Sequence, residues 1–94
     1  MKLPTPRVKK PAHPGEILEE EFLKPMNLSR SKLAQQSGIT ATTIQEICRG
    51  ERGITAKTAL RLGAFFKTAP ETWLQLQLNW DLWQEWIKLQ KKVS

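Results

Sequence analysis

The chain has 94 residues, enough for one small domain that buries about 60–65% of its unfolded surface. Lys and Arg outnumber Asp and Glu by 15 to 9, so an anionic partner is favoured. One cysteine excludes an intramolecular disulfide, and no apolar run is long enough for a signal segment or a membrane-spanning helix. We therefore expect a cytoplasmic protein with no membrane partner.

The inventory of reactive side chains argues against an enzyme. The sequence has one histidine and one cysteine, and it has no glycine-rich phosphate loop, so neither a metal cluster nor a catalytic constellation can be assembled. We predict no catalytic site, no metal and no cofactor. His13 starts a helix beside a proline and has a structural role, and Cys48 is a small buried hydrophobic residue.

Residues 1–12 are predicted to form a basic, flexible N-terminal arm. They contain Pro4, Pro6 and Pro11 with four basic residues and no acidic one, a composition that disfavours a packed element. Two roles are open for the arm, a solvated tail or a contact along DNA. Residues 13–94 then form a single domain.

The first helix is expected to begin at His13-Pro14-Gly15-Glu16, because proline is well tolerated at the first helical position. Pro25 ends it within a residue or two. Acidic residues cover its outer side and suit the positive end of the helix dipole. Its inner side is apolar and consists of Ile17, Leu18, Phe22 and Leu23.

Two short helices around Gly38 form the centre of the domain. Ser29 is a predicted N-cap for the first, and Thr40 is a predicted N-cap for the second. Gly38 between them can adopt the left-handed conformation that ends a helix. Two capped helices joined by a short glycine turn predict a helix-turn-helix unit.

The second of these helices, about residues 41–49, has two distinct faces. Ile44, Ile47 and Cys48 recur at helical spacing and should point inward. The outer face is small at its start and carries hydrogen-bonding groups further along, as a helix that reads the major groove requires. An ordinary surface helix is the alternative. The outer residues are Ala41, Thr42, Gln45, Glu46 and Arg49.

Positive charge is concentrated around this unit. Residues 24–67 include eight basic residues and only two acidic ones, Glu46 and Glu51. This excess of positive charge favours contact with phosphates. Arg52 lies in a tight connection, and Thr55 caps a fourth helix that ends near Phe66. Arg52 and the N–H groups near Thr55 suit a phosphate; an ordinary surface charge is the alternative for Arg52.

The last helix, about residues 70–90, is predicted to carry two apolar stripes. Trp73, Leu76, Trp80, Trp83 and Ile87 form the stripe for the protein's own core. A small chain cannot cover the second stripe, so a protein partner is implied. A kink near Trp80 that folds both stripes inward, or a helix at a membrane surface, are the alternatives. The interaction stripe comprises Leu78, Leu82, Trp86 and Leu89, and Leu74 extends it.

Several spaced motifs resemble one known family. The chain contains His13-Pro14-Gly15-Glu16-Ile17-Leu18, Leu33-Ala34, Gly38-Ile39, Ile54-Thr55-Ala56, Pro70-Glu71 and Asp81-Leu82. Together they resemble the HigA-type antitoxins of bacterial toxin–antitoxin modules, within the helix-turn-helix repressors of phage type. The resemblance covers about residues 13–82. Trp80 departs from the tyrosine that is usual there, and Ala69 from a serine.

The resemblance implies an all-α fold, a five-helix bundle with a helix-turn-helix and a long C-terminal helix. It also implies a homodimer that binds double-stranded operator DNA, represses its own operon and neutralises a toxin that cleaves messenger RNA. A stand-alone repressor without a toxin is the alternative. The residues aligned with base-reading positions are Thr40, Ala41, Thr42, Gln45 and Glu46, and the phosphate contacts are Arg30, Arg49 and Arg52.

Overall fold

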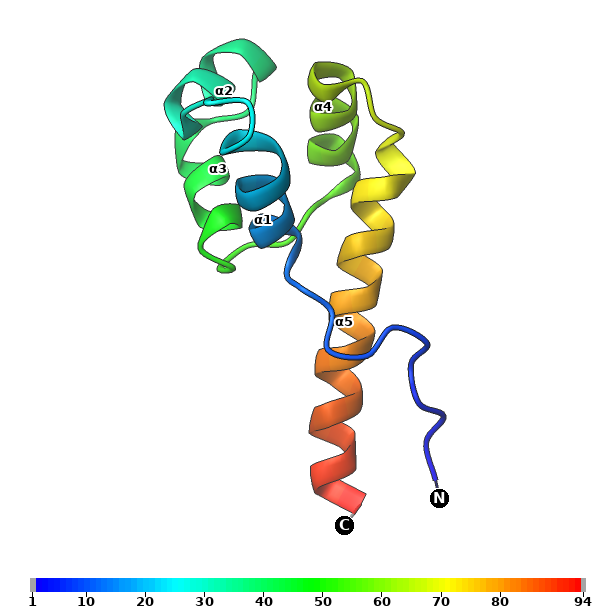
Figure 1. The fold of residues 1–94 in the computed structure, drawn as a ribbon. Helices are drawn as coiled ribbons and strands as arrows, with labels where there is room; N and C mark the ends of the chain where they lie inside the picture. Colours follow the sequence, from blue (N-terminus) through cyan, green and yellow to red (C-terminus); the bar gives the residue numbers. More distant parts are fainter. Residues whose placement is uncertain (1, 94) are drawn as a thin grey trace.

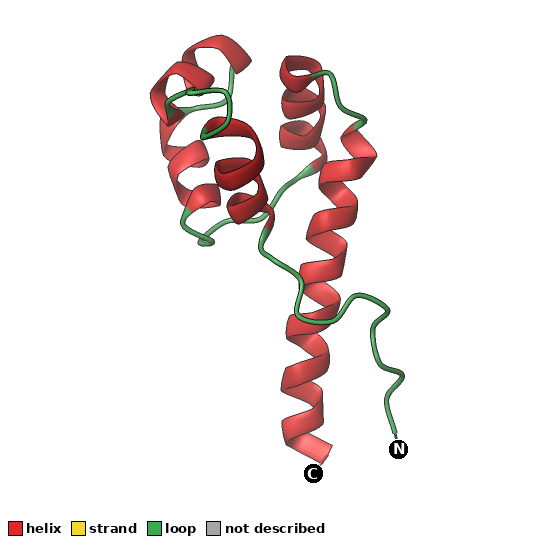
Figure 2. Cartoon of the chain, viewed as in Figure 1, coloured by secondary structure: helices red, strands yellow, loops and turns green. Residues whose placement is uncertain are grey.

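The computed structural model describes residues 2–93, and every regular element in that part of the chain is helical (Figures 1 and 2). The prediction of an all-α, five-helix bundle is confirmed. The elements are α1 (Pro14–Ile17), its continuation η1 (Leu18–Leu23), α2 (Arg30–Ser37), α3 (Ala41–Cys48), α4 (Ala56–Phe66) and α5 (Pro70–Val93).

The first helix departs from the expected regular α-helix. After one turn it widens into the π-helical segment η1, in which the N–H of Lys24 donates to the carbonyl of Glu19. Bonding to the fifth preceding residue brings positions five apart onto one side. Leu18 and Leu23 are both buried as a result.

Gly15 lets α1 lie directly against the end of α3. A Cβ atom there would overlap the carbonyl oxygen of Ile47 and lie 3.0 Å from the Cα of Cys48. The two backbones are therefore in contact without an intervening side chain. Only glycine permits this approach.

A single core joins all five helices. The indole of Trp73 fills the space between α4, α5 and η1, where its centroid lies 5.1 Å from that of Phe22, and its Nε1 donates to Thr68 at 2.8 Å. Such aromatic contacts add to the burial energy. The buried members of the core are Leu18, Leu23, Leu33, Ile39, Ile44, Ile47, Ile54, Ala59, Leu62 and Trp73.

Helix α5 is continuous over 24 residues, so the alternative of a kink near Trp80 is wrong. The molecule measures 48 × 23 × 22 Å because the second half of α5 extends beyond the other helices (Figure 1). The interaction stripe stays largely open, with Leu78 49%, Leu82 50% and Leu89 38% exposed. Trp86 is half-buried and stacks on Trp83 at 5.1 Å.

The N-terminal arm has no helix or strand in its described part, runs beside the second half of α5 and then crosses that helix to reach α1 (Figure 1). Leu3 and Pro6 are half-buried. Neither role considered from the sequence, a solvated tail or a DNA contact, included this packing. The flexibility of the arm stays a prediction.

His13 joins the start of α1 to α5. Its Nδ1 accepts a hydrogen bond from the N–H of Gly15 at 2.9 Å, and its ring meets that of Trp80 edge-on at 5.1 Å. Burial lowers the pKa of His13 below 6.5, although the charges of Asp81 and Glu16 act in the opposite direction.

We expect this burial to make stability depend on pH. The unfolded chain takes up the proton first, so the His13 contribution to the free energy of unfolding is complete above about pH 6.5. It should fall as the pH drops from there through the lower pKa of the folded state. Urea unfolding at about pH 7.5 and 5.5 measures the loss. His13→Asn keeps a capping acceptor without titrating, so an equal loss in that variant would contradict the assignment.

Candidate DNA-binding surface

Both helices of the helix-turn-helix begin at the caps expected from the sequence. Ser29 Oγ accepts from the N–H of Lys32 at 3.0 Å, and Thr40 Oγ1 accepts from that of Thr43 at 3.2 Å. Gly38 has φ +79°, a left-handed conformation that favours glycine. The helix-turn-helix prediction is confirmed by this geometry.

A contact from α4 holds the same turn, and sequence reasoning missed it. Arg61 Nη1 donates to the carbonyl oxygen of Gly38 at 3.0 Å. This cation satisfies a carbonyl at the end of α2, where the helix dipole is negative. The only available signal was that Arg61 is a basic residue on the exposed side of α4.

The recognition helix α3 has the two faces predicted for it. Ile44 and Ile47 are fully buried, whereas Ala41, Thr42 and Gln45 are exposed. Within the part of the chain that the structure describes, the side chains of Thr42 and Gln45 have no hydrogen-bond partner. Thr40 is exposed too, but its hydroxyl is engaged by both the N–H and the hydroxyl of Thr43.

Two predicted contact residues are paired with each other. Arg52 Nη2 lies 2.8 Å from Glu46 Oε1, and Arg52 Nε donates to the same oxygen at 2.9 Å. Both side chains remain partly exposed. The pair therefore fixes the Arg52 guanidinium beside the outer face of α3, while Arg49 is exposed at the end of that helix.

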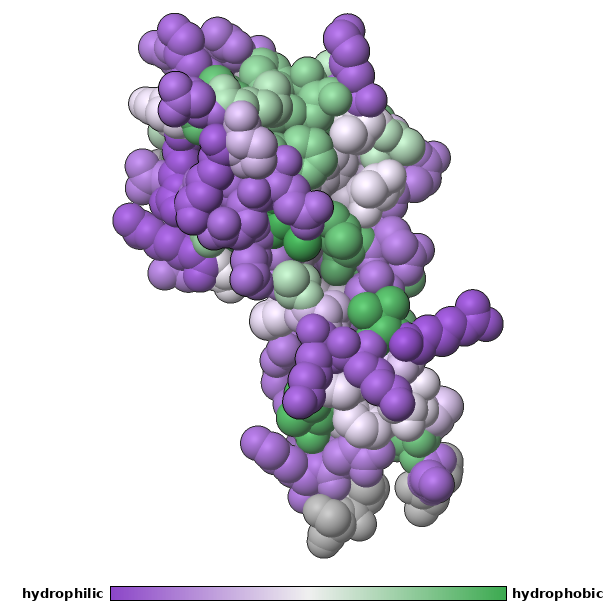
Figure 3. Space-filling model, in the orientation of Figure 1, coloured by the Kyte–Doolittle hydropathy of each residue, from purple (hydrophilic) through white to green (hydrophobic). Residues whose placement is uncertain are grey.

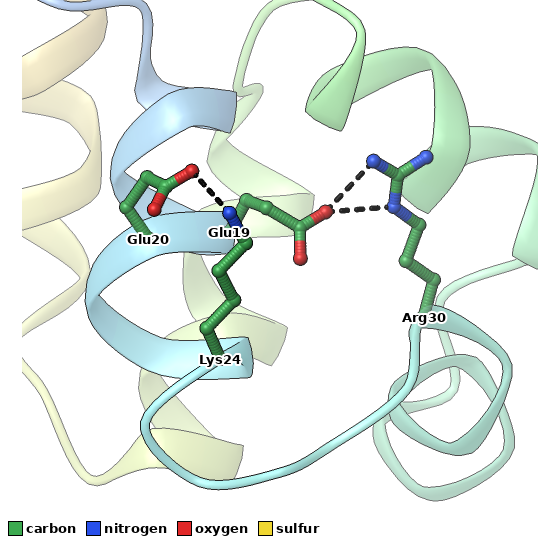
Figure 4. A network of polar contacts seen from close by, with 4 residues as sticks. All are labelled: Glu19, Glu20, Lys24 and Arg30. Atoms are coloured by element: carbon green, nitrogen blue, oxygen red, sulfur yellow. Dashed lines mark hydrogen bonds and ion pairs between the residues drawn. The ribbon is translucent and has the colours of Figure 1, made fainter.

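Arg30 is also held by an acidic residue. Its Nε and Nη2 atoms contact Glu19 Oε1 at 2.9 and 2.7 Å (Figure 4). The hydrogen bond to Glu19 raises the pKa of the Arg30 guanidinium. The pair joins α2 to η1 across the surface. A phosphate contact would therefore require the Arg30 guanidinium to bind Glu19 and the phosphate at the same time.

Cys48 is a further reactive side chain near this surface. Cys48 is half-buried, and burial raises the pKa of its thiol, which disfavours the reactive thiolate. Among the described residues, no group of histidine, cysteine or acidic side chains could hold a metal ion. None of the described helices is long and apolar enough to cross a membrane.

The similarity of this chain to known proteins includes the helix-turn-helix formed by α2 and α3. A family model for helix-turn-helix domains matches residues 20–74, which is more than half of the chain. The chain is 48% identical over 83 residues to virulence-associated protein I of Dichelobacter nodosus. This aligned region covers 87% of this chain and 77% of that protein. It is 33% identical over 86 residues to antitoxin HigA-1 of Vibrio cholerae, which covers 92% and 81%.

A solved structure agrees over nearly the whole fold. The Pseudomonas aeruginosa antitoxin HigA, solved with the higBA promoter, superposes with a TM-score of 0.85 at 38% identity, covering 90% of this chain and 92% of that one. Fold and site thus define a helix-turn-helix protein of the phage-repressor type. Within that class, the chain belongs to the HigA antitoxin family, and the resemblance found in the sequence is confirmed.

Proposed function

We propose that this chain is a sequence-specific DNA-binding antitoxin that represses its own operon and neutralises a partner toxin by direct binding. The observation that carries the proposal is the exposed start of α3 on a capped helix-turn-helix, where the side chains of Thr42 and Gln45 have no hydrogen-bond partner among the described residues. The solved antitoxin GraA in complex with its operator supports it, with a TM-score of 0.84 at 38% identity.

In this proposal Thr40, Ala41, Thr42, Gln45 and Glu46 face the bases, and Arg30, Arg49 and Arg52 face phosphates. The face over α2 and α3 is mainly hydrophilic (Figure 3), as a phosphate-contacting surface requires. Binding of the chain to DNA from upstream of its own reading frame, measured against random DNA at several salt concentrations, tests the proposal.

Thr42→Ala and Gln45→Ala are each expected to weaken operator binding by about 1–3 kcal/mol, because a contact with a base edge is lost. Affinity for random DNA should barely change, since that affinity depends on phosphates. Fluorescence anisotropy with both DNAs measures the two constants. Equal losses on operator and random DNA would mean that this face does not read sequence.

Arg52→Ala is expected to weaken binding to every DNA and to reduce the slope of log K against log salt by about one unit. The reason is the guanidinium that Glu46 holds beside α3. Lys88→Ala is the matched control, because it removes one exposed charge far along α5. An Arg52→Ala slope equal to that of the unsubstituted chain would exclude Arg52 from the phosphate contacts.

Two partners complete the proposed function. A second copy of the chain pairs through the interaction stripe, because one short recognition helix buries too little surface for tight specific binding. The cognate toxin, which cleaves messenger RNA in this proposal, is expected from an adjacent gene. Growth arrest by the neighbouring gene alone, relieved by this chain, separates an antitoxin from a stand-alone repressor.

A further inference from the structure

Residues 3–6 of the arm lie against the interaction stripe itself. Leu3, Pro4 and Pro6 line a surface hollow together with Leu82, Trp86 and Leu89 of α5. Figure 3 shows separate hydrophobic patches over this part of the molecule, where α5 and the arm meet. The arm therefore covers part of the stripe for which the proposed function requires a second copy of the chain.

The root of the arm keeps it near this surface. His13 contacts Trp80, so the chain is anchored within two helical turns of Trp86. A tethered segment has a high effective concentration at a site within its reach. A proline-rich segment also loses little conformational freedom when it docks on an apolar or aromatic surface.

The contact is nevertheless easy to displace. Among the described residues, no hydrogen bond or ion pair joins residues 2–10 to residues 70–90 of α5. Trp86 Nε1 is buried without a hydrogen-bond acceptor among the described residues, which is an unfavourable state for a polar group. Leu82 keeps half of its surface exposed beneath the arm. The arm therefore covers the stripe only in part and gives the Trp86 N–H no hydrogen-bond acceptor.

We propose that the N-terminal arm is a replaceable intramolecular cover of the interaction stripe, which must move aside before a second copy of α5 can pair there. Identical stripes with leucines four residues apart suit helix–helix packing across a twofold axis. The arm thereby lowers the affinity of dimerisation and shields Trp86 in the monomer. This inference rests on the proposed dimer contact.

The test removes the apolar contacts of the arm without changing its charge. Leu3→Ser with Pro6→Ser leaves every basic residue in place, so electrostatic effects are matched. Sedimentation without DNA should give a dimer dissociation constant about three- to tenfold lower than that of the unsubstituted chain, as expected when a partial apolar cover is lost. At concentrations where the chain is monomeric, acrylamide should quench tryptophan fluorescence more strongly.

Lys9→Arg is the control within the arm, because Lys9 is exposed, keeps its charge in this variant and lines no hollow with Leu82 or Trp86. The dimer dissociation constant of this variant should be unchanged. A weaker dimer in the Leu3→Ser, Pro6→Ser chain would make the arm a part of the dimer interface, and an unchanged dimer would exclude competition. Either result overturns the proposal. The Leu82→Ala, Trp86→Ala chain separates this proposal from the proposed dimer contact. If that chain is monomeric in the same assay, either contradicting result excludes only the covering role of the arm, and the proposed dimer contact still holds.

Discussion

Replacing Gly15 with alanine is expected to destabilise the fold by about 3 kcal/mol or more, which is large for a single methyl group. The added Cβ would overlap the carbonyl oxygen of Ile47 and crowd the Cα of Cys48. Both obstacles are backbone atoms and cannot rotate away, so α1 must move off α3. Thermal unfolding followed by circular dichroism should show a midpoint lower by about 12–24 °C.

Gly38→Ala is the matched control for this prediction. Apart from Gly38 and its two chain neighbours, no described atom lies within 4 Å of a Cβ at that position, and only its φ of +79° opposes a side chain. The expected cost is about 1–2 kcal/mol, the penalty of a left-handed conformation. If the two substitutions destabilised the protein equally, backbone overlap at α3 would not be the cause of the Gly15 effect.

Leu82→Ala together with Trp86→Ala is expected to give a folded, helical monomer with at least about 100-fold weaker operator affinity, because the second recognition helix is no longer tethered. A helix-turn-helix dimer presents its recognition helices about 34 Å apart to meet successive major grooves. Trp86 is the expected anchor, since aromatic residues tend to dominate interface energies. Sedimentation and anisotropy measure the two effects.

Leu60→Ala provides the control for loss of an exposed apolar side chain. Leu60 lies on α4, outside the interaction stripe, and is 61% exposed. The dimer dissociation constant and the operator affinity of the Leu60→Ala chain should match those of the unsubstituted chain. A Leu82→Ala, Trp86→Ala chain that still sediments as a dimer at micromolar concentration would place the dimer contact elsewhere.

Helix α5 is hydrogen-bonded to the loop beside the candidate DNA-binding surface. Gln77 on α5 accepts a hydrogen bond from the N–H of Ile54 at 2.7 Å and donates to Asp81 at 2.9 Å. Ile54 follows Arg52 by two residues, so α5 helps to fix the loop that holds this cation. The position of Arg52 relative to α3 therefore depends on both Glu46 and Gln77.

The sequence by itself determined the local features of this protein. Ser29, Thr40 and Thr55 cap their helices as predicted, because a cap needs only the backbone N–H groups two or three residues further along. The left-handed turn at Gly38 is equally local. Helical periodicity correctly assigned Ile44 and Ile47 to the core and Thr42 and Gln45 to the exposed face.

The tertiary structure decided the contacts between segments far apart in the chain. Arg61 and Gly38 are 23 residues apart, as are Gln77 and Ile54, and Gly15 meets Ile47 through backbone atoms alone. The packing of the arm on Trp86 joins the two ends of the chain. Periodicity and composition describe one segment at a time, whereas these contacts depend on how the helices are placed around a shared core.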